Sequence, residues 1–235
     1  MSLRARELVG ELMDDPSLDP REHGRALRGL ARLNRLSVAS SPIARALNAW
    51  GGRGADGIGD LLDVASGSGD VLVGVLDRVR VGRAHACDIS PVACDRIERR
   101  AAHAGREVRV FRCDAVSEGG LGACEYDAVM NALFLHHLDE GRVVALLRSM
   151  ARSLRAGGVL VVSDLLRTRR GYAMALVASR AVTRSYVVHA DALRSVRAAF
   201  TMDELRFLAD EAGLSGARLE RVWPQRALLT WEKPR

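Results

Sequence analysis

Hydrophobic runs of strand length alternate with amphipathic helical stretches over the middle of the chain. Short apolar runs predict strands, and apolar positions three or four residues apart between them predict helices. This alternation is typical of a parallel, doubly wound α/β sheet with right-handed crossovers. The predicted strands cover residues 60–65, 84–89, 107–113, 126–134 and 159–166, and the predicted helices cover 70–79, 90–104 and 139–158.

The N-terminal fifty residues have a different, wholly helical pattern. Asp19 is a candidate helix cap, and apolar positions at helical spacing follow it and fade near Ser37. A second helix is expected over 42–50, and a glycine-rich stretch at 51–59 breaks the chain before the first strand. We therefore expect an N-terminal helical cap over residues 1–52.

The C-terminal third predicts a lid, a helix and a hairpin. Residues 167–199 look helical but lack clean capping signals, which suits a lid over the sheet. Thr201 and Glu204 form a capping box that opens a helix over 202–213. Strands at 217–223 and 226–232 follow, separated by two residues as in an antiparallel hairpin. Residues 53–235 are thus expected to form one domain.

Composition restricts the class of protein. The chain has 235 residues, of which 48% are hydrophobic and 27% charged, as in ordinary globular proteins. The charged N-terminus is not a signal peptide, and Arg180 interrupts the longest apolar run, so we expect a cytoplasmic protein without a membrane span. The cysteines, Cys87, Cys94, Cys113 and Cys124, lack CxxC spacing, so reduced thiols and no metal site are expected.

The net charge of +6 and the pI of about 9.7 raise the question of nucleic acid binding. However, the basic residues are nearly all arginines, and they are scattered among acidic residues in every segment. Aromatic residues make up only 4% of the chain, which leaves little for stacking on bases. The sequence therefore argues against a nucleic acid partner.

The turn after the first strand, "LLDVASGSGD", carries the first candidate chemistry. Gly67 and Gly69 match two glycines of a dinucleotide-binding turn, but Leu72 occupies the place of the third. Asp70 places a carboxylate at the helix N-terminus, where it would repel a phosphate. These features favour a cationic nucleoside without phosphate, and S-adenosylmethionine fits that description.

Acidic residues at the ends of the next two strands support a nucleoside site. Asp88 stands where an acid accepts hydrogen bonds from ribose hydroxyls, and Asp114 can accept from an adenine amino group. Each could instead be a simple helix cap, but parallel strands end at one edge of the sheet, where ligands bind. The predicted cofactor-binding residues are Asp63, Ala65, Ser66, Gly67, Gly69, Asp88, Ile89, Cys113, Asp114, Ala115 and Asn131.

These motifs together resemble those of the class I S-adenosylmethionine-dependent methyltransferases. The resemblance rests on "LLDVASGSGD", "ACDIS", "RCDAV", "YDAVMNALFLHHLD" and "LRAGGVLVVSD", and it covers residues 60–232. The first motif is similar to that of the small-molecule branch, which includes quinone-biosynthesis and natural-product methyltransferases. The resemblance implies a Rossmann-like sheet of seven strands in the order 3-2-1-4-5-7-6, ending in the antiparallel hairpin.

Two histidines are candidate catalytic residues. His136, beside His137 at the end of the fourth strand, could be a base or could orient the substrate, or it could simply bond to Asp139. His189 could be a base oriented by Asp191 if the lid folds over the pocket; the alternative is a solvated helix face.

The resulting hypothesis is methyl transfer to a small acceptor, a phenolic, quinol or polyketide-like metabolite, at oxygen or carbon. The alternatives are an RNA or protein methyltransferase and a non-catalytic scaffold that binds the cofactor. NAD-dependent oxidoreduction is disfavoured by Asp70 and Leu72. A monomer or a homodimer is expected.

Overall fold

The computed structural model describes residues 3–15, 17–52, 57–117, 120–121 and 126–235. Within these ranges the strands are β1 (Ile58–Val64), β2 (Val81–Asp88), β3 (Val108–Arg112), β4 (Tyr126–Ala132), β5 (Leu154–Leu165), β6 (Arg218–Val222) and β7 (Arg226–Glu232). The α-helices are α1 (Pro20–Leu36), α2 (Ser40–Gly51), α3 (Asp70–Leu76), α4 (Pro91–His103), α5 (Glu140–Ser153), α6 (Arg169–Val182), α7 (Tyr186–Ala198) and α8 (Met202–Glu211). Two short 3-10 helices are η1 (Leu12–Asp14) and η2 (Leu135–His137).

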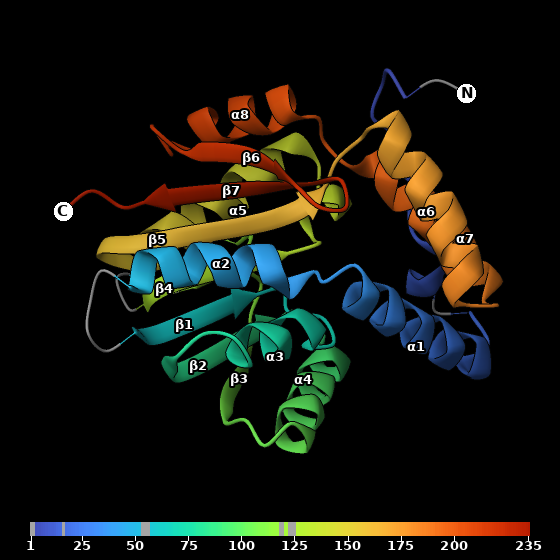
Figure 1. The fold of residues 1–235 in the computed structure, drawn as a ribbon, viewed down its shortest axis with the longest axis horizontal. Coiled ribbons are helices and arrows are strands. Elements are labelled where there is room, and N and C mark those ends of the chain that lie inside the picture. Colours follow the sequence, from blue (N-terminus) through green and yellow to red (C-terminus); the bar gives the residue numbers. More distant parts are fainter. Residues whose placement is uncertain (1–2, 16, 53–56, 118–119, 122–125) are drawn as a thin grey trace.

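The described strands form one sheet in the order β3-β2-β1-β4-β5-β7-β6. The neighbours from β3 to β5 are parallel, whereas β7 runs antiparallel to both β5 and β6 (Figure 1). The predicted fold class and strand order are therefore confirmed.

Helices cover both faces of the sheet, because each presents one apolar stripe to it. On one face, Ile43 and Leu47 of α2 pack with Leu61 and Met130 of the central strands. On the other, α5 and α8 bury a second set of apolar residues, including Leu146. Figure 1 shows α2 in front of the sheet and α8 at its upper edge.

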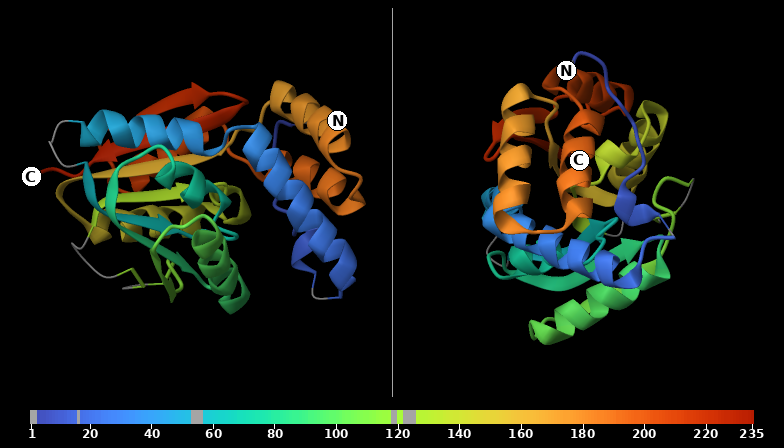
Figure 2. Two further views of the ribbon diagram at one scale, coloured as in Figure 1. Left: turned by 60° about the horizontal axis from the view of Figure 1, so that its bottom comes forward. Right: turned by 90° about the vertical axis from the view of Figure 1, so that its right-hand side faces the viewer.

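A third group of helices, α1, α6 and α7, stands beyond the carboxyl ends of the parallel strands (Figures 1 and 2). The three pack on one another, and Ala26 of α1 is buried with Val187 and Val188 of α7. We call these three helices the cap. They enclose the edge of the sheet where a doubly wound fold binds its ligand.

The cap differs in two respects from the prediction. The helix expected over 42–50 is α2, which lies on the sheet because its apolar stripe joins the sheet core. The segment 167–199 forms two helices, and α6 has a clean cap, since the Thr168 hydroxyl accepts from the Gly171 N–H at 2.9 Å.

One predicted helix boundary is also wrong. The helix expected to reach residue 158 ends at Ser153, and β5 begins at Leu154. Leu154 pairs with Tyr126 of β4, and a register shift precedes the regular pairing that begins at Val159. Gly157 and Gly158, which were expected to end the helix, therefore lie in an irregular part of β5.

Two features of the sequence analysis lie outside the described residues: Cys124 and the centre of the glycine-rich stretch at 51–59. None of the described helices has both the length and the apolarity needed to cross a bilayer.

Candidate active site

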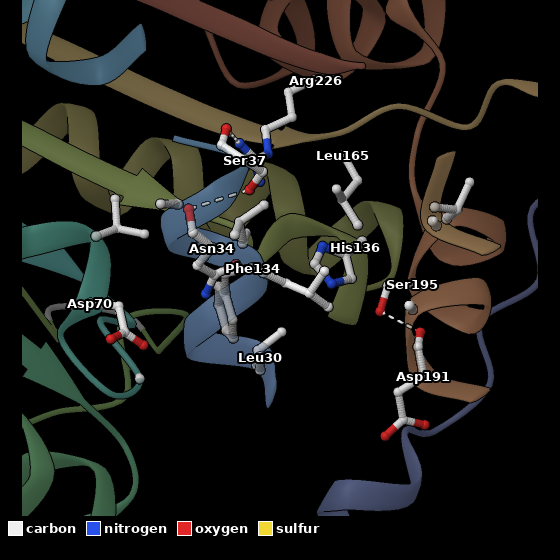
Figure 3. Close-up of a pocket in the computed structure, with 18 of the residues that line it drawn as sticks. Leu30, Asn34, Ser37, Asp70, Phe134, His136, Leu165, Asp191, Ser195 and Arg226 are labelled. Carbon is white, nitrogen blue, oxygen red and sulfur yellow. Dashed lines mark hydrogen bonds between the residues drawn. The ribbon is translucent and has the colours of Figure 1, made fainter. Parts of the chain in front are cut away.

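A cavity of about 510 Å³ lies between the cap and the carboxyl edge of the sheet. Figure 3 shows its span, from Asp70 at the start of α3 to Asp191 and Ser195 on α7, with His136 between them. Most of the wall is apolar, and polar groups gather in two places, the turn after β1 and the surroundings of His136. The apolar lining includes Met13, Leu30, Leu33, Leu133, Phe134, Met174, Ala175, Ala178, Val182, Val188, Ala192 and Val196.

The turn after β1 has the shape that its glycines predict. Ala65, Gly67 and Gly69 all have positive φ, at +53°, +59° and +73°, so the chain reverses tightly before α3. The Gly67 N–H donates to the carboxylate of Asp88 at 3.0 Å, which ties the turn to the end of β2. Of the residues predicted to bind the cofactor, Ala65, Ser66, Gly67 and Asp88 line the cavity.

Asp63 supports this turn from below. It is buried, and its carboxyl accepts from the Ser66 hydroxyl at 2.5 Å. Burial raises the pKa of Asp63 to about 7, and the nearby negative charge of Asp88 adds to that effect. Its second oxygen has no hydrogen-bond partner among the described residues. This oxygen is buried beneath the turn, and Asp63 is not among the described residues that line the cavity.

The turn also fits S-adenosylmethionine in its polar groups. Each oxygen of Asp88 accepts one backbone N–H, from Gly67 and from Ser90. Because each carboxylate oxygen can accept twice, Asp88 can still accept from ribose hydroxyls. A side chain at Gly67 would point into open space, so the turn leaves room for a ligand against its backbone.

Asp70 contributes less free charge than the sequence suggests. Its carboxylate forms an ion pair with Arg100 of α4 and accepts from the Ser68 hydroxyl at 2.6 Å. Arg100 therefore offsets part of the negative charge that was expected to repel a phosphate.

The remaining predicted cofactor residues lie near the cavity without lining it. Asp114 and Ile89 are exposed, and Cys113 bonds through its N–H to the carbonyl of Asp88 at 3.1 Å. Asn131 is fully buried, and its amide donates to the carbonyl of Val64 at 2.7 Å, linking β4 to β1. These residues, which are absent from the cavity wall as far as the structure describes it, are Asp63, Gly69, Ile89, Cys113, Asp114, Ala115 and Asn131.

His136 is the centre of the second polar group. It is buried, and its Nδ1 lies 2.6 Å from Asp164 Oδ1 while its backbone N–H donates to Asp164 Oδ2. Its Nε2 lies 3.9 Å from Glu11 Oε1. Burial opposes protonation of the ring, but the two carboxylates outweigh it and raise the pKa of His136. The alternative, a bond from His136 to Asp139, is not among the hydrogen bonds of the described residues, because Asp139 caps α5 by accepting from Arg142.

His137 lies beside it in η2, with the two ring centroids 4.3 Å apart. Burial, together with the neighbouring His136, lowers the pKa of His137. Both histidines line the cavity.

The hydrogen bonds of His189 and Asp191 go to groups other than the predicted partner. Asp191 turns to the N-terminal segment, where its carboxylate accepts from the N–H groups of Leu12 and Met13 at 2.7 and 3.0 Å. The Nε2 of His189 lies 2.8 Å from the carbonyl of Thr183, and His189 does not appear among the described residues of the cavity wall. The physical reason is helical geometry, because residues two apart on α7 face different directions.

Four residues of the site were missed from the sequence. Glu11 and Ser195 enter from the N-terminus and α7, and the Ser195 hydroxyl donates to Glu11. Asp164 ends β5, and Arg226 begins β7 with its guanidinium donating to Ser37. Burial lowers the pKa of Arg226 to about 10. Only Asp164 had a detectable signal, since it is an acid at the carboxyl end of a predicted parallel strand.

The comparison with protein families identifies the domain. Residues 61–158 match the model of a family described as a methyltransferase domain. Residues 61–158 therefore carry a methyltransferase domain. With this domain match, the predictions of an enzyme and of S-adenosylmethionine as its cofactor are confirmed. None of the curated proteins matches the chain.

Solved structures share the fold of the methyltransferase domain at low sequence identity. The plantazolicin methyltransferase BpumL, in complex with a triazolic desmethylPZN analog and SAH, is 12% identical with a TM-score of 0.71, and the match covers 92% of each chain. A putative O-methyltransferase from Nostoc punctiforme is 17% identical with a TM-score of 0.66, covering 97% of this chain and 64% of that one. An O-methyltransferase family 2 protein from Planctomyces limnophilus, in complex with apigenin, is 21% identical with a TM-score of 0.63, covering 93% and 63%. The chain thus spans less than two thirds of the last two proteins, and such identities show a common fold alone.

Proposed function

We propose that this methyltransferase domain methylates a small, largely apolar acceptor, a phenolic, quinol or polyketide-like metabolite of secondary metabolism. The observation that carries the proposal is that one cavity is lined both by the cofactor turn and by the polar residues around His136. An apolar wall with a few convergent polar groups is the usual form of a small-molecule site.

The cap makes the acceptor end of the cavity apolar. Leu30 and Leu33 of α1, Met174 of α6 and Val188 of α7 face it from three helices. An aromatic or alkyl body would gain roughly 25 cal/mol for each Å² buried there, and the same wall excludes water from the reacting groups. Among solved structures of this fold, complexes with apigenin and with a triazolic desmethylPZN analog support an acceptor of this size.

The polar end suits an acceptor that must lose a proton. When bound, S-adenosylmethionine supplies the methyl group as an electrophile on its sulfonium. Asp63, Ala65, Ser66, Gly67, Gly69, Asp88, Ile89, Cys113, Asp114, Ala115 and Asn131 are proposed to form its site. His136, oriented by Asp164, is the proposed catalytic residue at the acceptor end of the cavity. The predicted cytoplasmic location and the monomeric or homodimeric state remain predictions.

Cofactor binding is tested by calorimetry with S-adenosylmethionine. Asp88→Ala should weaken binding by about 10- to 100-fold, because it removes charge-assisted hydrogen bonds from the turn and the ribose. Equal binding by wild type and variant would contradict the assigned site.

The acceptor class is tested with labelled cofactor and a panel of alkyl phenols, quinols and polyketide-like phenols. Transfer of label to at least one of them is expected. His136→Gln should lower turnover by about 100-fold or more while cofactor affinity is kept, whereas His189→Ala should leave turnover unchanged. Tight cofactor binding without transfer to any of these acceptors would instead favour the scaffold alternative.

A further inference from the structure

Three potential metal ligands meet at the inner wall of the cavity. Glu11 lies just before η1, and His136 and His137 lie in η2, so the cluster joins residues that are far apart in the sequence. One ligand atom from each residue lies within 4.8 Å of the other two. All three residues line the cavity, and His136 faces the cap in Figure 3.

The surroundings hold these atoms in place. Because the Asp164 carboxylate can only accept, the Nδ1 of His136 donates its proton to Asp164 at 2.6 Å. In the neutral ring the lone pair is then on Nε2, on the side of Glu11, 3.9 Å away. The hydroxyl of Ser195 donates to the same Oε1 of Glu11. Outer carboxylates and hydroxyls that orient a histidine and a carboxylate in this way are typical of metal ligands.

The donor set itself defines the class of ion. Two imidazole nitrogens and one carboxylate oxygen suit Zn²⁺ and the other first-row divalent ions, and they leave a further coordination position for a substrate atom. With metal–ligand bonds of about 2.0–2.2 Å, tetrahedral ligand atoms are about 3.4 Å apart. The three side chains would therefore close by roughly 1 Å around an ion, within the reach of small rotations of each side chain.

We propose that Glu11, His136 and His137 bind a divalent metal ion of the Zn²⁺ type, whose open position takes an acidic oxygen of the acceptor. This inference rests on the proposed function, because it assigns the acceptor oxygen to the cavity next to the cofactor turn. An oxygen bound to a divalent ion has a lowered pKa, so a phenolic hydroxyl would lose its proton to bulk water as the acceptor enters the cavity and stay bound to the ion as the phenolate. The site thus selects acceptors with an acidic hydroxyl.

The first test measures the metal site without any acceptor. The full chain is treated with a chelator, and binding is followed by calorimetry with Zn²⁺ and by the visible absorption of Co²⁺. One ion per chain is expected. Glu11→Gln and His137→Ala should each abolish binding or weaken it by at least about 100-fold, and Asp164→Asn should weaken it by about 10- to 100-fold. His103→Ala, at an exposed position of α4, is the matched control and should bind like the wild type.

Thermal unfolding and S-adenosylmethionine affinity of each variant show that it is folded. If neither ion binds at millimolar concentration, or if Glu11→Gln and His137→Ala bind like the wild type, the proposal is overturned.

The two proposals fail in different ways. Transfer of label to a phenol at the same rate in excess chelator, by protein that binds no ion, would overturn the metal site and leave the methyl transfer intact. Ion binding that depends on Glu11 and His137, in protein that methylates none of the acceptors, would support the metal site and contradict the proposed function.

Discussion

Ala65 has a left-handed backbone conformation, with φ at +53°, at the position where turns of this kind often have their first glycine. This conformation costs an L-residue roughly 1–2 kcal/mol, whereas glycine adopts it freely. Ala65→Gly should therefore stabilise the native state by up to about 1 kcal/mol, after the greater entropy of the unfolded glycine is counted. Urea unfolding measures the change.

The matched control is Ala173→Gly, at an exposed position of helix α6. There the same substitution should destabilise by up to about 1 kcal/mol, because glycine is a poor helix former. Equal losses at both positions would show that the turn at Ala65 is not strained.

Asp63 predicts how stability depends on pH. The unfolded carboxyl ionises near pH 4, but burial holds its native pKa at about 7, so the native state must lose stability as the pH rises from 4 to 7. The full effect is on the order of 4 kcal/mol. Asp63→Asn removes it, so the variant should gain stability over the wild type at pH 8, and the gain at pH 5 should be about one third as large. Unfolding at both pH values checks this, and an equal difference at both would contradict the assigned pKa.

At the scale of elements, the βαβ part of the chain was the most predictable. Each strand there is a short apolar run and each helix has an apolar stripe, so local pattern and tertiary packing agree. The hydrophobic pattern gave the wrong element or position where tertiary packing determines the structure. The segment after Ser153 has helical composition but pairs with β4, and α2 lies on the sheet because Ile43 and Leu47 fit its core.

The close packing of α1 in the cap depends on Gly29. A Cβ added there would lie 2.8 Å from Thr183 Oγ1 and 3.1 Å from its Cβ, at the end of α6. Gly29→Ala should therefore lose about 1–3 kcal/mol to overpacking, against a gain of about 1 kcal/mol in helix propensity. It should also raise the KM for the acceptor, since α1 forms part of the cavity wall.

Gly24→Ala on the same helix is the control for propensity. Its Cβ would lie 3.4 Å from the flexible end of Arg28, so this variant should gain up to about 1 kcal/mol and keep its KM. If the two variants unfold alike, α1 does not depend on close approach at Gly29.

At the scale of the whole molecule, the site depends on contacts between distant parts of the chain. The cofactor turn could be predicted because its residues are adjacent and end consecutive strands. Glu11 could not, because it lies about 125 positions before His136, and only the packing of the N-terminal segment on α7 brings them together. The sequence predicted no metal site, because the residues of the site proposed here have no recognisable ligand spacing.

Residues 3–14, here called the strap, run along α7 and close the cavity. Asp191 accepts from two of its N–H groups, Arg194 donates to the carbonyl of Gly10, and the guanidinium of Arg6 lies 3.8 Å from the ring centroid of Phe200. The buried residues of the two large cores come from Ile43 onward. The strap is thus attached to a domain whose main cores do not include it.

Deletion of residues 2–14 should separate cofactor binding from catalysis. S-adenosylmethionine affinity should stay within about threefold of the wild type, because β1, β2 and their own hydrogen bonds hold the turn and Asp88. Turnover of a phenolic acceptor should fall by at least about 100-fold, since Glu11 and Met13 leave the wall and water enters the cavity. Calorimetry and labelled-methyl transfer measure the two quantities, and thermal unfolding monitors the fold.

Asp191→Asn weakens the attachment of the strap and should lower turnover as well, but by less than the deletion does. A truncated protein that methylates at the wild-type rate would show that the strap is no part of the active site.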